Sequence, residues 1–152
     1  MCTVDLYLES CKKRNVSPNS TVKSLLADPQ FTFSSVERID VARNYLGDRG
    51  ASALLDVIKE CDNIRMLNLS NNGLHNRGMT EVRSALKGLK FLSELDISRN
   101  SVSENGAKEI IALLNENTSI TTVNYDLTMV PEFFQLKIDD ALEKNRKAAV
   151  SA

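Results

Sequence analysis

Apolar and polar positions along the chain recur at an interval of 28 residues. The copies start at four apolar anchors: Val36, Ile64, Leu92 and Ile120. After each anchor, apolar residues alternate with polar ones, as at Leu67 and Leu69, which predicts a β-strand with one buried face. Apolar residues then recur at offsets of three, four and seven, which predicts an amphipathic helix. The helical series are Ala51, Leu54, Leu55 and Ile58; Met79, Val82 and Leu86; and Ala107, Ile110, Ile111 and Leu114.

Two polar landmarks share this interval. The first is an asparagine ladder at Asn44, Asn72 and Asn100, and the second is a glycine at Gly50, Gly78 and Gly106. An amide side chain both donates and accepts hydrogen bonds, so we expect the ladder to satisfy backbone groups buried where each strand turns. Its neighbour Asn71 is expected to face solvent. We expect each glycine to open a helix where the chain packs closely against the strand layer.

A strand and a helix that return the chain to a parallel strand form a right-handed crossover. One such unit cannot bury both of its apolar faces, so neighbouring units are expected to stack around a shared core. The pattern resembles the ribonuclease-inhibitor class of leucine-rich repeats, whose units have this length and carry a full helix on the convex side. We therefore predict an α/β fold, a right-handed leucine-rich-repeat solenoid of 28-residue strand–helix units, with complete repeats at 36–63, 64–91 and 92–119.

The two ends of the chain depart from the repeat and predict helical caps, so that residues 1–152 form a single domain. Residues 1–35 are expected to form an N-terminal cap, residues 36–126 the repeats, and residues 127–152 a C-terminal cap; a peptide-like helix that binds another molecule is the alternative for the N-terminus. In the first cap, Val4, Leu8 and Cys11 predict a helix ending near Asn15, and a second helix ends at Asp28-Pro29.

The C-terminal cap follows a fourth, incomplete unit. Thr128 stands at the ladder position, and Phe134 stands at the glycine position. Pro131 suits the first turn of a helix whose apolar stripe is Phe134, Ile138, Ala141 and Leu142. Basic side chains favour a helix C-terminus, so Lys144, Arg146 and Lys147 are expected to end this helix; a binding arm is the alternative.

Composition narrows the class of partner. The chain carries 19 basic and 20 acidic residues, so no overall field attracts nucleic acid or an anionic membrane surface. Its first residues lack the cationic and apolar segments of a signal peptide, and no stretch has the length and apolarity of a membrane span. The three cysteines are irregularly spaced, as expected of reduced thiols. We expect a cytoplasmic protein.

Signals for catalysis and for cofactors are weak. The single histidine, His75, has no cysteine or serine partner at a recognisable spacing, and the chain contains neither C-x-x-C nor a glycine-rich phosphate loop. A non-enzymatic protein without a cofactor or metal is therefore predicted. Ran GTPase-activating proteins are built from similar repeats, and Arg43 and Arg99 stand beside the ladder asparagines; this resemblance implies a GTPase activator as a less favoured alternative.

Outward positions of the predicted strands form the candidate binding surface on the concave face. Its predicted partner-binding residues are Arg38, Asp40, Met66, Asn68, Glu94, Asp96, Asn124 and Asp126. The surface is acidic overall, which suits a protein partner with a basic surface and affects mainly association rate and orientation. Solvated strand positions without a binding role are the alternative. The adjoining loops at Asp48-Arg49, His75-Asn76-Arg77 and Glu104-Asn105 are included in the predicted surface.

A second resemblance lies near the C-terminus. The segment 117–125, N-T-S-I-T-T-V-N-Y, is similar to the last repeat of tropomodulins, and Asp28-Pro29 before the first strand is similar as well. Tropomodulins cap the slow-growing ends of actin filaments, so this resemblance implies an actin-capping or cytoskeletal regulatory role. The main prediction is a protein-interaction module or adaptor in a cytoskeletal or signalling assembly, and the tropomodulin-like role is the alternative.

Overall fold

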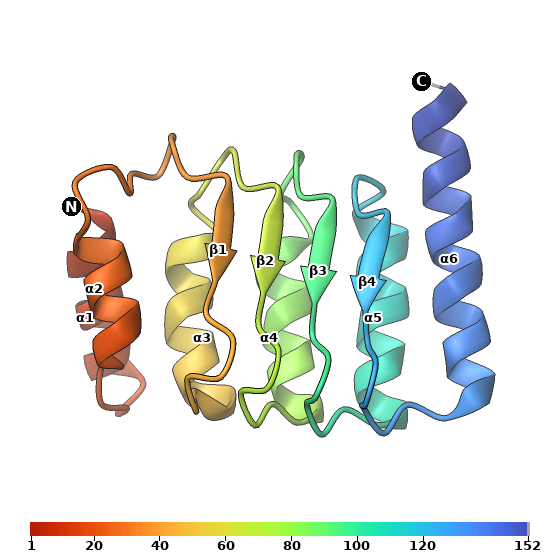
Figure 1. Cartoon of the computed structure of the whole chain (residues 1–152), viewed down its shortest axis with the longest axis horizontal. Helices are drawn as coiled ribbons and strands as arrows, with labels where there is room; N and C mark the ends of the chain where they lie inside the picture. The colour runs from red at the N-terminus through yellow and green to blue at the C-terminus, as the bar shows by residue number, and fades with distance from the viewer. Residues whose placement is uncertain (152) are drawn as a thin grey trace.

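The computed structural model describes residues 1–151 and combines one parallel sheet with a layer of helices (Figure 1). The four strands follow one another in the order β1-β2-β3-β4, and the helices α3, α4 and α5 lie behind them. The elements are α1 Thr3–Lys13, α2 Ser20–Ala27, β1 Arg38–Asp40, α3 Gly47–Ile58, β2 Met66–Asn68, α4 Asn76–Leu86, β3 Glu94–Asp96, α5 Glu104–Glu116, β4 Thr122–Asn124 and α6 Glu132–Ser151. The predicted α/β class with a parallel sheet is confirmed.

The strand register follows the sequence interval. The central residues of the four strands, Ile39, Leu67, Leu95 and Val123, pair side by side from β1 to β4. Each of these side chains is buried, and each has an outward-facing residue on either side of it along its strand. The alternation in the sequence therefore corresponds to one buried position and two outward positions in every strand.

The helices cover the other face of the sheet and pack against one another in the order α1, α3, α4, α5, α6. Most of the residues of the predicted apolar series are buried against the strands and the neighbouring helices. Ile111 in α5 is only half-buried. Fully burying one aliphatic side chain stabilises the fold by about 1.5–3 kcal/mol, so this shared interior is the main source of stability.

The repeating glycine has a different neighbour from the one predicted. A Cβ atom on Gly78 would overlap Asp48 Oδ1, and one on Gly106 would lie 2.5 Å from Val102 Cγ1 and 2.6 Å from Asn76 Oδ1. The close approach is therefore to a polar side chain from the first turn of the preceding helix, joined at Gly106 by Val102 from the loop before α5, and not to the strand layer. Glycine is required at these two positions because any side chain would displace Asp48 at Gly78, and both Asn76 and Val102 at Gly106.

The N-terminal segment folds into α1 and α2 as predicted, but α1 buries a different face. Tyr7 and Cys11 are each 1% exposed, whereas Val4 and Leu8, expected on the buried face, are only half-buried. The face is rotated because α1 packs against α2 and α3 at once. The backbone N–H of Asn19 donates to the Tyr7 hydroxyl at 2.9 Å. Burial raises the pKa of Tyr7 to about 12.

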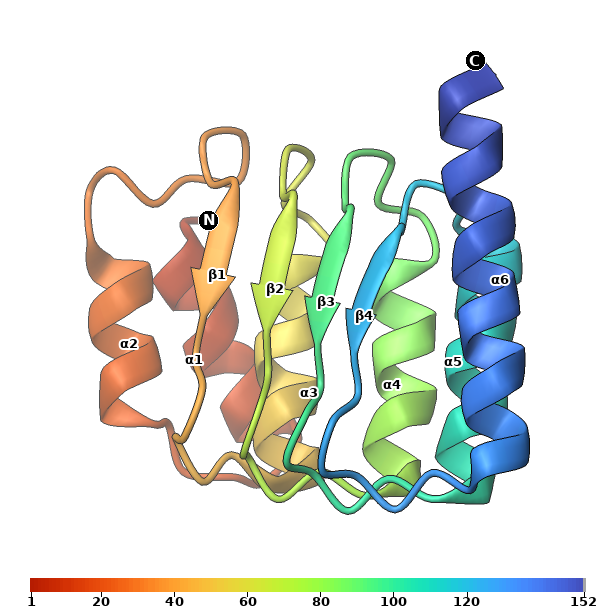
Figure 2. The same ribbon diagram turned by 45° about the vertical axis from the view of Figure 1, so that its right-hand side comes forward.

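The C-terminal helix α6 packs against α5 and buries Ile138 and Leu142. Figure 2 shows that its last turns extend beyond the other helices. The helix continues to Ser151, so the prediction that Lys144, Arg146 and Lys147 end it is wrong. Arg146 is held instead by the backbone carbonyl of Thr121, which accepts from its Nε at 2.9 Å.

Candidate functional site

The outward strand positions form two aligned rows, and we call this surface the strand face. One row pairs Arg38 with Met66, Glu94 and Thr122, and the other pairs Asp40 with Asn68, Asp96 and Asn124. Met66, Asn68 and Asp96 are half-buried, and the other members are exposed. Between β2 and β4 the face contains a hollow of about 170 Å³. The structure thus brings these predicted residues together on one surface, and Asp126 lies exposed directly beyond β4.

The second row also has a structural task that the sequence analysis did not assign. In each strand the Asp or Asn side chain accepts a hydrogen bond from the backbone N–H two residues later. These distances are 3.0 Å at Asp40, 2.9 Å at Asn68, 2.9 Å at Asp96 and 3.0 Å at Asn124. Such turns end a strand, and both Asp and Asn form them. A change from Asp to Asn therefore removes charge from this face and keeps the turn.

The asparagine ladder lies directly behind the ends of the strands. Asn72 donates from Nδ2 to the carbonyls of Val41, Leu69 and Ser70, and its Oδ1 accepts from the N–H groups of Asn44 and Leu46. Asn100 repeats this arrangement one unit later, toward the backbone of the second and third units. These buried amides join neighbouring units and leave no donor for a partner, so they are part of the scaffold.

The loops named as recognition segments are partly structural. Asp48 Oδ1 accepts from the N–H of His75 at 2.9 Å, and Asn76 Oδ1 accepts from the N–H groups of Ser103 and Gly106 at 2.9 and 3.0 Å. Glu104 forms an ion pair with a lysine one turn later in α5. These acceptors bind the start of the next helix, and hydrogen bonds of this kind stabilise helix N-termini. Asp48 and Asn76 are therefore links between units.

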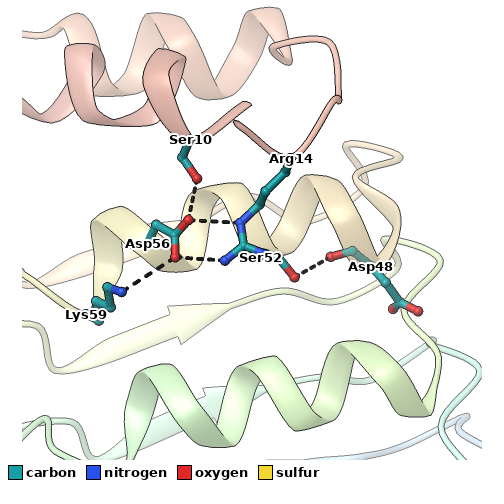
Figure 3. A network of polar contacts seen from close by, with 6 residues as sticks. All are labelled: Ser10, Arg14, Asp48, Ser52, Asp56 and Lys59. Carbon is teal, nitrogen blue, oxygen red and sulfur yellow. Dashed lines mark hydrogen bonds and ion pairs between the residues drawn. The ribbon is translucent and has the colours of Figure 1, made fainter. Parts of the chain in front are cut away.

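A polar network between α1 and α3 is the strongest charged contact of the N-terminal segment (Figure 3). Arg14 donates from Nε and Nη2 to the two carboxylate oxygens of Asp56 at 2.9 and 3.0 Å, and the Ser10 hydroxyl donates to the same group. Lys59 Nζ lies 3.7 Å from Asp56 Oδ1. Burial alone would raise the pKa of Asp56, but the bonds from Arg14 and Ser10 outweigh it and lower that pKa. The network fixes α1 on the first unit.

Groups with catalytic or metal-binding potential are dispersed. His75 is exposed in the loop before α4. Within residues 1–151, no three His, Cys, Asp or Glu side chains are grouped to hold a metal ion. Cys11 and Cys61 are buried free thiols, and burial raises the pKa of Cys61 to about 12, so this thiol is a poor nucleophile. No helix in the described part of the chain has the length and apolarity needed to cross a membrane.

Comparisons with known proteins agree with this geometry. The family model described as "Leucine Rich repeat" matches residues 34–55. This match and the fold support a leucine-rich-repeat protein. Its structure is similar to that of the domain titled "Leiomodin-1 Actin-Binding Site 2", with a TM-score of 0.70 and 21% sequence identity over 95% of this chain and 90% of that one.

A second similar structure is the tropomodulin C-terminal domain of Caenorhabditis elegans. Its TM-score is 0.52 at 11% identity, and the likeness covers 76% of this repeat protein and 87% of that chain. The likeness to tropomodulins expected from the segment 117–125 is confirmed at the level of the fold. No curated protein sequence matches this chain.

Sequence reasoning missed a further set of links in this repeat protein. Asn117 Nδ2 donates to the carbonyls of Leu86 and Leu89, and Asn145 Nδ2 donates to those of Leu114 and Ile120. Both asparagines are buried and tie the end of one helix to the next unit. Their positions differ by the repeat interval, which is the signal that would have revealed them.

Proposed function

We propose that this repeat protein is a non-enzymatic protein-interaction module whose partner is actin. The supporting observation is the likeness to the leiomodin-1 domain, whose title names it an actin-binding site and which corresponds to nearly the whole of this chain. The fold hosts many functions, so the proposal depends on a binding surface as well as on the fold. A cytoskeletal location follows from the same proposal.

We propose the strand face as the docking surface. Glu94 and Asp96 place two carboxylates at the hollow, Asp40 adds a third on β1 in the same row as Asp96, and Met66 supplies an adaptable apolar contact at the hollow. No ion pair engages these carboxylates within the described residues, and the turn bonds to Asp40 and Asp96 come from neutral groups, so their negative charge is available to a basic patch on a partner. Exposed charges of this kind raise association rates and fix orientation.

The repeat units and the two end segments support the strand face. In our proposal the units form a right-handed solenoid, residues 1–35 cap one end of its core, and residues 127–152 cap the other. In support, α1 packs on α3 and α6 packs on α5, so that both end helices of the row are covered (Figure 1). The caps would keep the strand face rigid, because an uncovered end unit would expose its apolar side.

The test is elongation of pyrene-labelled actin from filaments whose fast-growing ends are blocked. The intact chain is expected to slow growth at the free, slow-growing ends. The variant Asp40→Asn/Glu94→Gln/Asp96→Asn should lose most of this effect and keep its melting temperature, because the Asp→Asn changes retain the turn acceptors. Growth that is unaffected by the intact chain at about 50 µM, well above the micromolar Kd common for transient partners, would refute actin as the partner.

If actin is refuted, the strand face still predicts a general adaptor with a basic protein partner. Proximity crosslinking in cells, followed by identification of the crosslinked proteins, is the measurement for that candidate. The charge-neutral variant is the matched control: a partner of the strand face must be recovered with the wild-type chain and depleted with the variant. Equal recovery with both chains would remove the strand face as the site.

A further inference from the structure

A second exposed surface follows the loops that join each strand to its helix. We define the loop edge as residues 43–49, 71–77, 99–105 and 127–133. We propose that the loop edge binds a protein segment in which several carboxylates are followed by an apolar side chain. This proposal concerns a different surface from the strand face and does not require actin to be the partner.

The loops of the edge lie side by side, so matching positions form rows. Backbone N–H groups of Arg43, Asn71 and Arg99 donate to the carbonyls of Ser70, Ser98 and Asp126 at 3.1, 3.0 and 2.9 Å. These bonds join each loop to the next along the whole sheet. Figure 1 shows the four loops together at the lower edge of the molecule. Side chains from successive units are therefore neighbours there.

The first three units present guanidinium groups without carboxylate partners on this edge, of which only that of Arg49 makes a hydrogen bond, at 3.5 Å to the carbonyl of Asn15, within the described residues. Arg43, Arg49, Arg77 and Arg99 are all exposed, and none forms an ion pair within residues 1–151. Of the five arginines elsewhere, Arg14, Arg65, Arg83 and Arg146 each pair with a carboxylate, and only Arg38, on the strand face, is likewise unpaired within the described residues. Of the acidic groups on these three loops, Glu104 pairs with Lys108, and Asp48 accepts from the N–H of His75 and forms no ion pair with the arginines. Arginine suits carboxylate ligands because its planar fork matches both oxygens.

The last unit changes this row from cationic to apolar. Leu127, Met129 and Phe133 occupy the positions that follow Arg99, Ser101 and Asn105 by one repeat interval. These three side chains are 69%, 66% and 62% exposed. Clustered exposed apolar groups of this size mark interaction surfaces. The carboxylates of Asp126 and Glu132 lie at the same end, so they repel an acidic segment from the last unit and direct its charged part toward the arginines.

The identity of these side chains is not explained by the fold. Position 43 and its equivalents have left-handed backbones, with φ of 61° at Arg43, 54° at Asn71, 57° at Arg99 and 57° at Leu127. Glycine and asparagine adopt this conformation most readily. The bulky arginine and leucine side chains add no buried contact there, so their value lies in what they present to solvent.

The dimensions suit a short extended segment. Neighbouring strands lie about 4.8 Å apart, so three steps along the sheet span about 14 Å. An extended peptide rises about 3.3 Å per residue, so four or five residues cross the edge. Nucleic acid fits less well, because its phosphates continue past the arginines to the last unit, where the exposed carboxylates of Asp126 and Glu132 would repel them.

The probe is a synthetic peptide with four consecutive glutamates followed by leucine and phenylalanine, titrated into the isotopically labelled intact chain. Amide NMR shifts report where it binds. Two variants test the two halves of the surface: Arg43→Gln/Arg99→Gln, and Leu127→Asn/Met129→Gln. Asparagine suits the left-handed backbone at position 127, so the second variant is expected to fold. Arg65→Gln is the control, because Arg65 is paired with Glu37 at 3.9 Å outside the loop edge.

We expect shifts in the four loops and a peptide affinity about tenfold lower for each test variant, since each removes two surface contacts. Arg65→Gln should bind like the wild type, and a peptide with glutamine for glutamate should bind at least tenfold more weakly. The proposal is overturned by no shifts at about 1 mM peptide, by shifts confined to the strand face, or by equal binding of the glutamine peptide. If single-stranded RNA displaces the peptide and binds the Leu127→Asn/Met129→Gln variant as tightly as the wild type, the loop edge is a nucleic-acid site instead.

Discussion

Replacement of Asn72 by alanine is the sharpest test of how the units are joined. The side chain is 1% exposed and makes hydrogen bonds in both directions along the stack. Its Oδ1 is the acceptor for the N–H groups of Asn44 and Leu46 at 2.9 and 3.4 Å. Its Nδ2 donates to three carbonyls, of which Val41 O also accepts from Asn44, and Leu69 O also accepts from Asn100. Removal of the Asn72 side chain therefore leaves mainly the N–H groups of Asn44 and Leu46 without a hydrogen-bond partner.

The magnitude follows from that inventory. A buried polar group left without a partner costs about 1–3 kcal/mol. Two orphaned N–H groups then predict a loss of about 2–6 kcal/mol, and the partial access of water at Asn44, which is half-buried, places the expected value near 3 kcal/mol. Domains of this size are stable by about 5–15 kcal/mol, so Asn72→Ala should remain folded but be strongly destabilised.

The assay is urea unfolding followed by circular dichroism, since the chain contains no tryptophan for fluorescence. The matched control is Asn71→Gly: Asn71 is exposed, and its φ of 54° is as accessible to glycine as to asparagine. The control should lie within about 0.5 kcal/mol of the wild type. Alanine is a poorer control there, because the left-handed backbone adds its own strain. Equal losses for Asn72→Ala and Asn71→Gly, at unchanged m-value, would refute the reasoning.

Two further predictions concern other contacts of the scaffold. Gly78→Ala should lower the free energy of unfolding by about 1–3 kcal/mol, because its Cβ would displace Asp48, whereas Gly88→Ala, which meets no atom within 4 Å, should be neutral or slightly stabilising in the same urea assay. The pKa of Asp56 is lowered in the fold, so its contact with Arg14 contributes stability above the unfolded pKa near 4 and loses it as pH falls. Asp56→Asn should be less stable at pH 7 and show a shallower decline in melting temperature between about pH 5 and 3; an unchanged decline would contradict this account.

Periodic features could be predicted from the sequence because each depends on residues at a fixed spacing. The buried strand positions, such as Leu67, and the helical faces, such as Leu54 and Ile58, follow directly from the alternation and the three-to-four spacing. Two helices before the first strand were also predictable, since Asn19 caps the second and accepts from the N–H of Val22. The likeness to tropomodulins was visible in the short segment before and within β4.

Other features depend on how elements meet, and the linear pattern carries little of that information. Tyr7 is more deeply buried than Leu8 because two helices contact α1 from different sides. Asp48 and Asn76 resemble surface residues in the sequence, and only the stacking of units places them over the next helix. Whether an arginine of the loop edge is paired likewise depends on the fold, because the stacking of units decides which carboxylates lie within reach of it.

Isothermal titration of monomeric actin with the intact chain, beside its Asp40→Asn/Glu94→Gln/Asp96→Asn variant, tests the central functional claim most directly. The account predicts saturable binding to the wild type, weakened at least tenfold in the variant, with melting temperatures of the two chains within about 2 °C, since surface changes that keep the turn acceptors alter stability little. Binding of equal affinity to both chains, or no binding to the wild type, would contradict it.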